Sequence, residues 1–526
     1  MTALVTDRAP RETFNSEQLA AARALICKVY GISPEERDPD VIAKAFVQPT
    51  SATTGLQTYN LDPVAYLLFP QLTPLRNKIK RKGGGKNIQA EWEAVTGLST
   101  SFYSAGIPQA QRGILLQETT QRFFASFRTL GADNRVSLQA ELAAQEMIDL
   151  RSLASLNALR WLMIQEEGMI VGGRSAANAL GITPAPVVTA NAAGGSLPAG
   201  PLSVICVALS FNAYWALGGM NNGFYGTAQN LATAVIPGQV VSTTANGFAF
   251  TTGGGSAQKS ANTAAAIVAG GSATAIVAPV TGAAAYAWFW GAAGQETLGA
   301  ITSSRTVTIT APAAGNQLAS TLPAQDSSFN SFEFDGMLSL LSNPTSGALV
   351  QTLAVVTPGV GPTLTYSGAN SIREIDNFLL AMWNNVRTQP DVMYMNVQEL
   401  IDINTRIIGG GGKPIINFVM DNSPQSVMSL IAGGVVALYV SPVNGKVIRM
   451  ETHPNIPQGT ILFWSDSIPY TVSNIDALVQ IQTRREYWQQ EWPMVTNQYE
   501  YGCYVDEVLQ VYFPPAFGLL QGIAAG

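Results

Sequence analysis

The chain reads DNRVSLQAELAAQEMIDLRSLASLNALRWLMIQEE from Asp133 to Glu167, without a glycine or a proline. Its leucine, alanine, glutamine and glutamate residues lose little side-chain entropy in a helix. Asp133 and Asn134 can cap the start, and Gly168 can take a left-handed turn at the end. The stretch therefore predicts one spine helix, roughly 50 Å long, lying across a sheet. One apolar face is expected at Leu153, Leu156, Leu159 and Met163.

The composition favours several domains and a surface that is largely covered. The chain has 526 residues, of which 47% are hydrophobic and only 12% are charged, against a usual charged share of about a quarter. This length predicts two or three domains. The 49 glycines and 29 prolines indicate many turns and strands, which disfavours an all-α bundle around the spine. The net charge of −6 argues against a nucleic-acid binder that acts by bulk electrostatics.

The cysteines and the apolar stretches bear on the compartment. Cys27, Cys206 and Cys503 are far apart and odd in number, so we expect no disulfide framework and a reducing compartment. The N-terminus lacks the basic-then-apolar pattern of a secretion signal. The uncharged, alanine-rich run from Thr263 to Gln295 contains glycines and a proline, which favour short strands and turns. We therefore expect no membrane span.

A cationic run precedes the spine. Residues 72–86 read LTPLRNKIKRKGGGK, with alternation around Ile79 that predicts an exposed strand. One interpretation is a contact to phosphate or to an acidic partner surface, and the other, slightly favoured, is a solvated arm. Two apolar-patterned runs, 88–97 and 112–131, then predict the legs of a long β-hairpin. The candidate contact residues are the six cations Arg76, Lys78, Lys80, Arg81, Lys82 and Lys86.

A sharp change of composition marks residues 184–325. Only Lys259, Glu296 and Arg305 are charged there, and alternating strands such as LSVICVALS and SRTVTITAP are separated by glycine-rich and asparagine-rich turns. Tryptophan and tyrosine residues within the segment argue for a packed core rather than low complexity. Several short strands with regular turns predict an inserted immunoglobulin- or fibronectin-like β-sandwich.

Mixed α/β patterns return from Phe329 onward. The run FNSFEFDGMLSLL is interpreted as a strand followed by a turn. A capping box at Ser371 to Glu374 opens a helix whose apolar residues share one face, and VQELIDINTRII forms another helix that stops at Gly409. Short strands such as VMYM, GTILFWSD and EYGCYVDEVLQVYF complete the pattern.

The sequence contains little that suggests catalysis. His453 is the only histidine, so no histidine-based triad or metal cluster can form without it, and a structural role is favoured. The glycines at 409–412 are followed by Lys413 and Pro414, which does not match a phosphate-binding loop. The carboxylates are scattered. We expect no catalytic, cofactor-binding or metal-binding residues, and no enzyme activity.

The order of these segments resembles the major capsid protein of tailed double-stranded DNA bacteriophages, whose fold is shared with the herpesvirus capsid floor. DPVAYLLFPQLTPLRNKIKRKGG is similar to the passage from an N-terminal arm into an extended loop. FEFDGMLSLL and REIDNFLLAMW resemble the start of the axial domain, and RREYWQQEW with YGCYVDEVLQVYF resembles the return to the peripheral domain. The inserted sandwich departs from the minimal family pattern.

The resemblance implies an α+β capsid fold and a division of the chain. The segments are an N-terminal arm (1–75), an extended β-hairpin loop (76–130), a peripheral domain with the spine helix (131–183), the inserted sandwich (184–325), peripheral-domain strands (326–345 and 480–513), an axial domain (346–479) and a C-terminal tail (514–526). It also implies a structural subunit that assembles as pentamers and hexamers into an icosahedral shell around double-stranded DNA.

The implied partners are other copies of the chain, a separate scaffolding protein, a portal, a possible decoration protein and packaged DNA that is contacted weakly. The implied location is the virion capsid, assembled in the host bacterial cytoplasm. We expect a shell without covalent cross-links, and the cationic run would face an acidic patch on a neighbouring subunit. The alternative from a different class is a phage tail or surface module, built on the sandwich, that binds the host or a carbohydrate.

Overall fold

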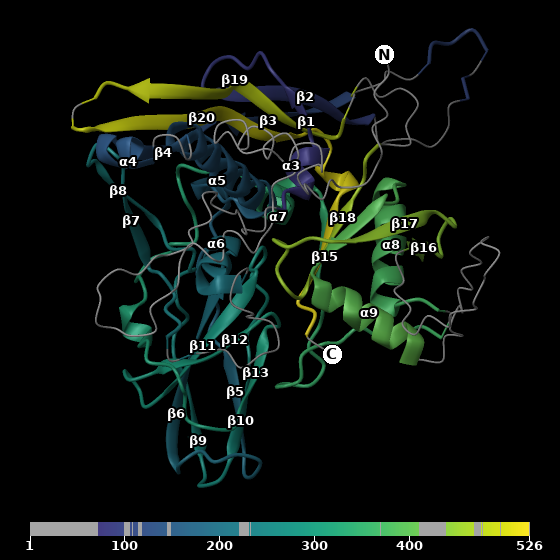
Figure 1. The fold of residues 1–526 in the computed structure, drawn as a ribbon. Helices are drawn as coiled ribbons and strands as arrows, with labels where there is room; N and C mark the ends of the chain where they lie inside the picture. Colours follow the sequence, from purple (N-terminus) through teal and green to yellow (C-terminus); the bar gives the residue numbers. More distant parts are fainter. Residues whose placement is uncertain are drawn as a thin grey trace, which may run out of the picture. The chain divides into compact units, whose positions relative to one another are not determined.

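The computed structural model describes most of the chain beyond residue 71 (Figure 1). The described residues are 72–98, 106–107, 109–113, 118–144, 149–219, 231, 233–368, 370–409, 438–467, 475, 477–494 and 496–524. The predicted arm up to residue 71 and most of the hairpin tip lie outside this range. By its internal contacts the chain divides into two compact units, 1–70 with 138–150, and 71–137 with 151–526. The described part of the first unit is mainly α4 (Leu138–Ala144).

The predicted single spine helix is wrong at both ends, since the helix begins later than predicted and continues through Gly168, which does not take the expected left-handed turn. Residues Arg128–Ser137 form strand β4, and the helix α5 runs from Leu150 to Gly172. Asp133 and Asn134 therefore lie in a strand, where they pair with Gly502 and Tyr501 of the C-terminal strand β20. Helix propensity is a weak preference, and pairing with a distant strand overrides it here.

The buried face of α5 also differs from the predicted one. The buried positions step by four residues, while Leu156 of the predicted face is 42% exposed. Alanines on the buried face allow the backbone of α5 to lie close to a sheet, and the Asn134 side-chain amide donates to the Ala154 carbonyl at 3.2 Å. This buried row consists of Ala154, Ala158, Leu162 and Glu166.

The sheet under α5 joins the two ends of the described chain. Its strand order is β1 (Lys80–Lys82), β19 (Val479–Trp492), β20 (Gln498–Val511) and β4. The short strand β1 runs parallel to β19, whereas the other neighbours are antiparallel. It follows a one-turn helix, α3 (Pro74–Lys78). The long pair β19–β20 is drawn in yellow in Figure 1.

The expected long β-hairpin is confirmed. Strands β2 (Gln89–Leu98) and β3 (Glu118–Ser126) pair antiparallel and form a sheet of their own. Most side chains of β3 are exposed, and Phe124 is 69% exposed. A two-stranded ribbon has little core, so its order depends on packing at its base. There Trp92 stacks on Phe123 and meets the edge of Tyr512.

A six-stranded mixed sheet forms a second body of structure. Helices α8 (Arg373–Val386) and α9 (Val397–Gly409) accompany it, as the sequence predicts. Ile375, Phe378 and Met382 of α8 are buried on one face, as expected. The strand order is β14 (Leu349–Thr352), β21 (Gly518–Gln521), β18 (Thr460–Trp464), β15 (Val392–Met395), β17 (Val447–Thr452) and β16 (Leu438–Val440).

The central strands of this sheet are buried on both faces, which explains the uninterrupted apolar sequence of β15. Val392 and Tyr394 pack with α5 and the sheet under it, whereas Met393 and Met395 pack with α8 and α9. Side chains alternate between the faces of a strand, so one short strand contributes to two cores. Stacking of Phe378 on Phe463, with ring centroids 4.2 Å apart, belongs to the second core.

The strand expected within FNSFEFDGMLSLL is wrong. Residues Met337–Ser342 form the short helix α7, which begins after Gly336. Met337 and Leu341 point into the core at helical spacing, and the Ser342 hydroxyl donates back to the Leu338 carbonyl at 2.5 Å. The spacing of the apolar residues fits a helix turn better than a strand.

The expected two-sheet β-sandwich within 184–325 is present. One sheet contains three strands and the other four, and the second carries a core on each face. The first has the order β13 (Thr306–Ile309), β10 (Ser272–Ile276) and β5 (Val187–Asn191). The second has the order β12 (Thr297–Thr302), β11 (Ala285–Gly291), β6 (Gly200–Leu209) and β9 (Thr263–Ile267). A hairpin of β7 (Gln239–Thr243) and β8 (Ala249–Gly253) lies outside these sheets, and the short helix α6 (Phe211–Tyr214) follows β6.

The immunoglobulin assignment of this sandwich is not confirmed. In chain order, the first, fourth and seventh sandwich strands form one sheet, and the other four form the second. An immunoglobulin constant domain instead places its first, second, fourth and fifth strands together. Composition and alternation identify strands and their buried faces, but they do not specify which strands pair.

The alanine-rich run 263–295 forms β9, β10 and β11 as expected. No helix in the described ranges has both the length and the apolar character needed to cross a membrane.

Gly168 provides a test of how closely α5 is packed. A Cβ atom there would lie 1.8 Å from the Trp215 ring. Alanine is the better helix former by about 1 kcal/mol, but we expect Gly168→Ala to lower the free energy of unfolding by about 2 kcal/mol, because overpacking dominates. The control is Gly409→Ala at the end of α9, where no described atom lies within 4 Å. Urea unfolding checks both, and a stabilised Gly168→Ala variant would contradict the packing.

Candidate functional site

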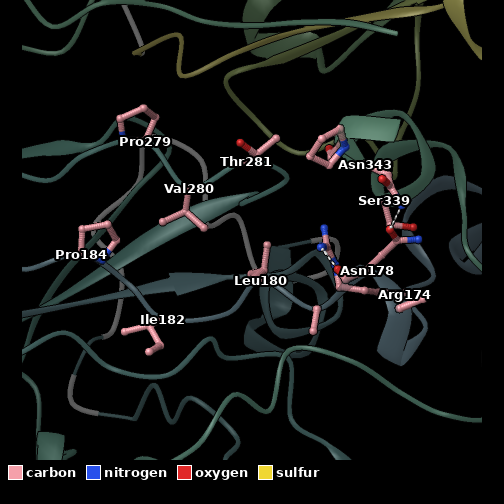
Figure 2. Close-up of a pocket in the computed structure, with 14 residues that line it drawn as sticks. Arg174, Asn178, Leu180, Ile182, Pro184, Pro279, Val280, Thr281, Ser339 and Asn343 are labelled. Carbon is pink, nitrogen blue, oxygen red and sulfur yellow. Dashed lines mark hydrogen bonds between the residues drawn. The ribbon is translucent and has the colours of Figure 1, made fainter. Parts of the chain in front are cut away.

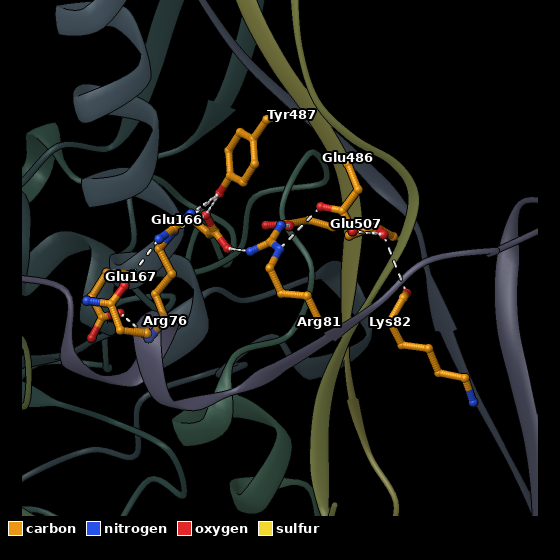
Figure 3. A network of polar contacts seen from close by, with 10 residues as sticks. Arg76, Arg81, Lys82, Glu166, Glu167, Glu486, Tyr487 and Glu507 are labelled. Carbon is orange, nitrogen blue, oxygen red and sulfur yellow. Dashed lines mark hydrogen bonds and ion pairs between the residues drawn. The ribbon is translucent and has the colours of Figure 1, made fainter. Parts of the chain in front are cut away.

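Two adjacent glutamates near the end of α5 are completely buried. Glu166 and Glu167 both have 0% exposure, although glutamate is rarely found inside a protein without partners. Glu166 continues the four-residue step of the buried face after Ala158 and Leu162. The carboxylates therefore point into the space where α3, β1, β19 and β20 meet (Figure 3).

Glu166 is held by two arginines from the cationic run. The Arg76 Nε atom donates to Glu166 at 2.7 Å, and Arg81 donates to the other carboxylate oxygen. The Tyr487 hydroxyl of β19 donates to the same carboxylate. Both guanidinium groups also lie over the Tyr487 ring, with Arg81 4.9 Å from its centroid. Charge-assisted hydrogen bonds of this kind are about twice as strong as neutral ones.

Glu167 binds the first turn of α3 and the only histidine. Its carboxylate accepts hydrogen bonds from the backbone amides of Leu75 at 3.0 Å and Arg76 at 2.7 Å. The His453 Nε2 atom lies 2.6 Å from Glu167 Oε1. Because His453 Nδ1 accepts a hydrogen bond from the Asn455 amide, Nε2 carries the proton and donates it to Glu167. His453 is buried, which agrees with the structural role favoured from the sequence.

A third buried carboxylate, Glu507 of β20, completes the network. Arg81 donates to Glu507 as well as to Glu166, so its guanidinium bridges α5 and β20. Burial followed by repulsion from Glu166 raises the pKa of Glu507, and Arg81 opposes that rise. Burial alone would lower the pKa of Arg81, but the carboxylates of Glu507 and Glu166 raise it. Arg81 is therefore the positive charge that the two buried acids share.

The structure separates the six candidate contact residues into two groups. Arg76 and Arg81 belong to the buried network, and the Lys78 ammonium lies 2.8 Å from Asp466 and 3.1 Å from the Tyr394 hydroxyl. The other three are exposed and have no polar side-chain partner among the described residues; they are Lys80, Lys82 and Lys86. Only this second group is available to a partner, and the hypothesis of an inter-subunit contact stays a prediction for it.

Sequence reasoning missed the acids of this network. It identified Arg76 and Arg81 as part of a charged run but did not connect them with Glu166, Glu167 or Glu507. Arg81 is 85 positions from Glu166 and 426 positions from Glu507 in the sequence. One available signal was the position of Glu166 at four-residue spacing after small and apolar residues. Within the described part of the chain, no group of histidine, cysteine and acidic residues could hold a metal ion. The geometry is that of a structural junction: it anchors the segment leading into the β2–β3 hairpin.

Comparisons with known proteins give matches at the level of structure. No protein-family model and no curated protein matches the sequence. A chain from the capsid of Myoviridae phage XM1 is 9% identical, covers 88% of this chain and 97% of its own length, and has a TM-score of 0.38. A chain from the cyanophage A-1(L) capsid is 11% identical, with coverage of 89% and 98% and a TM-score of 0.39. A chain from Gordonia phage Cozz is 9% identical, with coverage of 91% and 99% and a TM-score of 0.38.

Removal of Arg81 tests the junction. Arg81→Met leaves Glu166 and Glu507 buried without their shared partner, so we expect the free energy of unfolding to fall by about 3 kcal/mol or more. The control is Arg122→Met in the hairpin, which removes an exposed ion pair with Glu91 and should have no measurable effect. The first cooperative transition in urea checks both variants. Equal effects at the two sites would contradict the role of the junction.

Glu399 of α9 gives a separate prediction on pH. Burial of the carboxyl group raises the pKa of Glu399 from 4.5 to about 8. Backbone hydrogen bonds to the carboxylate oppose this rise but are weaker. The folded state therefore binds this proton more tightly than the unfolded state, so stability falls as pH rises from about 4.5 to 8 and levels off above. Glu399→Gln removes this contribution, on the order of a few kcal/mol at pH 8. Urea midpoints between pH 5 and 9 check it, with the surface variant Glu491→Gln as control; parallel pH profiles for Glu399→Gln and the parent would contradict it.

Proposed function

We propose that this chain is a structural subunit of a phage capsid, assembling with copies of itself into pentamers and hexamers of a closed icosahedral shell around double-stranded DNA. The observation that carries the proposal is the β2–β3 hairpin. It has almost no core of its own, yet its base is fixed by a buried ionic network. A rigid base with an exposed ribbon suits an element that lies on a neighbouring copy.

The apolar residues on the hairpin support this role. Phe124 and Val95 are 69% and 59% exposed, and Ile88 at the start of the ribbon is 79% exposed. Large exposed apolar side chains on one element are typical of an interaction surface. In a shell, each copy meets several neighbours through heterologous contacts that must close, so a projecting ribbon adds contact area without a large core. The low charge of the whole chain fits the same role.

The free lysines supply a complementary electrostatic contact. Lys80 and Lys82 lie on β1, which is the edge strand of its sheet, and Lys86 directly follows the three glycines at 83–85. Exposed charges on an edge strand discourage random pairing and favour an acidic partner. We assign this edge to an acidic patch of a neighbouring copy. The net charge of −6 leaves DNA contacted only weakly, which favours packaging and ejection.

The proposed structural role also implies partner proteins and a location for the subunit. A separate scaffolding protein, a portal and a decoration protein are the partners proposed for the virion shell, with assembly in the host cytoplasm and no catalytic activity of the subunit itself. The carbohydrate-binding alternative has less support, because Trp288 and Trp290 of the sandwich are buried in its core rather than displayed as a platform. Trp288 Nε1 donates to Thr302, and Trp290 Nε1 donates to the Ala311 carbonyl.

Electron microscopy of the expressed chain, alone and with a scaffolding protein, tests the proposal. Closed shells, tubes or malformed shells are the expected products. Discrete monomers or trimers in both preparations would overturn it.

The hairpin gives a sharper test within the same experiment. We expect Phe124→Asp to leave thermal unfolding of the unassembled chain within about 2 °C of the parent, since the side chain is exposed, but to abolish closed particles because a buried, unpaired charge is costly at an interface. The matched control is Phe124→Tyr, which keeps the ring and should assemble. Normal particles from Phe124→Asp would exclude the hairpin from the subunit contact.

A further inference from the structure

A buried arginine lies where the sandwich meets the end of α5. Arg174 follows α5 by two positions and is 3% exposed. Its two terminal nitrogens donate to the backbone carbonyls of Asn178 at 2.5 Å and Gly282 at 2.7 Å. The Nε atom is buried and has no hydrogen-bond partner. A guanidinium group has five N–H donors, so the two carbonyls leave three of them unused.

The positive charge of Arg174 has no ion-pair partner among the described residues. The two acids that influence it are occupied elsewhere: Asp335 accepts from the backbone and hydroxyl of Ser175, and Asp326 accepts from the backbone amides of Gly181 and Ser328. Burial lowers the pKa of Arg174 to about 10, although both acids oppose this. A buried charge satisfied only by neutral carbonyls is unfavourable, and an anion would relieve it.

Arg174 lines a cavity of about 370 Å³ between the sandwich and α7 (Figure 2). Polar side chains gather on one side, where the Asn343 amide donates one of its two hydrogens to Asn178. The apolar rim includes Val280 of the sandwich and Leu180 of the segment that precedes it. A cavity with one uncompensated guanidinium, spare amide hydrogen and apolar walls has room for a small oxyanion and the carbon atoms attached to it.

We propose that this cavity is a binding site for a small oxyanion, either inorganic phosphate or a carboxylate carried by a peptide. The anion is held by the unused hydrogens on the two terminal nitrogens of Arg174 and by the second amide hydrogen of Asn343. Because the lining comes from both the sandwich and α7, the bound anion links the insertion to the body that carries it. The site goes beyond the shell role proposed above and does not depend on assembly.

The test uses the full chain in unassembled form at pH 7. Sodium phosphate and sodium acetate are titrated separately, with sodium chloride at matched ionic strength, and thermal unfolding is measured together with calorimetric binding. We expect a saturable rise in Tm, with half-effect in the millimolar range, that chloride does not produce. Saturation by phosphate alone identifies phosphate as the ligand class, whereas saturation by acetate identifies a carboxylate. No saturable response to either anion beyond that of chloride overturns the proposal.

Variants at Thr281 separate binding from general stability. Thr281 is exposed at the cavity and does not contact Arg174 in the network of hydrogen bonds. Thr281→Glu brings a carboxylate of the chain itself to the site, so we expect a higher Tm without ligand and an affinity for the added anion weakened by about tenfold or more. Thr281→Gln is the neutral control of similar size and should bind within about twofold of the parent. Equal anion affinities for the two variants would overturn the proposal even if some stabilisation by anions were observed.

Discussion

The described fold depends on the buried ionic junction around Glu166. Two arginines from the segment before the hairpin, Arg76 and Arg81, converge on a carboxylate in the last turns of α5, and Arg81 continues to Glu507 of β20. Without these contacts, β1 would be a three-residue edge strand with only backbone pairing to β19. Such an edge alone would not fix the direction of the ribbon that follows it.

The buried charges of the junction restrict how the segments can pack more than they add to the net stability of the fold. A buried ion pair adds little net stability compared with well-packed apolar residues, but removal of one partner is costly. Glu166 and Glu507 share Arg81, and Glu167 is held by the α3 amides and His453. The same contacts connect α5, the long β19–β20 pair and the loop carrying His453. An exposed hairpin on a rigid base can transmit a contact made at its exposed residues to the subunit body.

The sequence identified those parts of the fold that are specified by local pattern. The β2–β3 hairpin, the buried strand β15 and the amphipathic helices α8 and α9 follow from alternation or helical spacing within a few residues. The failures occurred where distant pairing decides the outcome. The composition of the last residues in 128–137 favours a helix, but the whole segment pairs with β20 in a sheet. The sandwich strands were recognisable, whereas their distribution over two sheets was not, because pairing depends on which edges meet after folding.

Only part of the site could be predicted from the sequence, because the rest depends on residues that are distant in the chain. A run of six cations is visible in the sequence, but nothing local distinguishes the half-buried Arg76 and Arg81 from the exposed Lys80 and Lys82. That distinction arises from Glu166 and Glu507, which reach the arginines only in the folded chain. Arg174 gave no sequence signal at all, since its neighbours in the cavity come from three separate segments.

We propose that the β2–β3 hairpin is exposed in the single chain and buried against a neighbouring copy in a shell. Hydrogen–deuterium exchange of residues 89–98 and 118–126, measured for unassembled chains and for purified particles, tests it most directly. We expect the amides of the ribbon to become strongly protected on assembly, while those of the buried strand β15 change little. Equal exchange of the ribbon in the two states, in particles that are closed and intact, would contradict it.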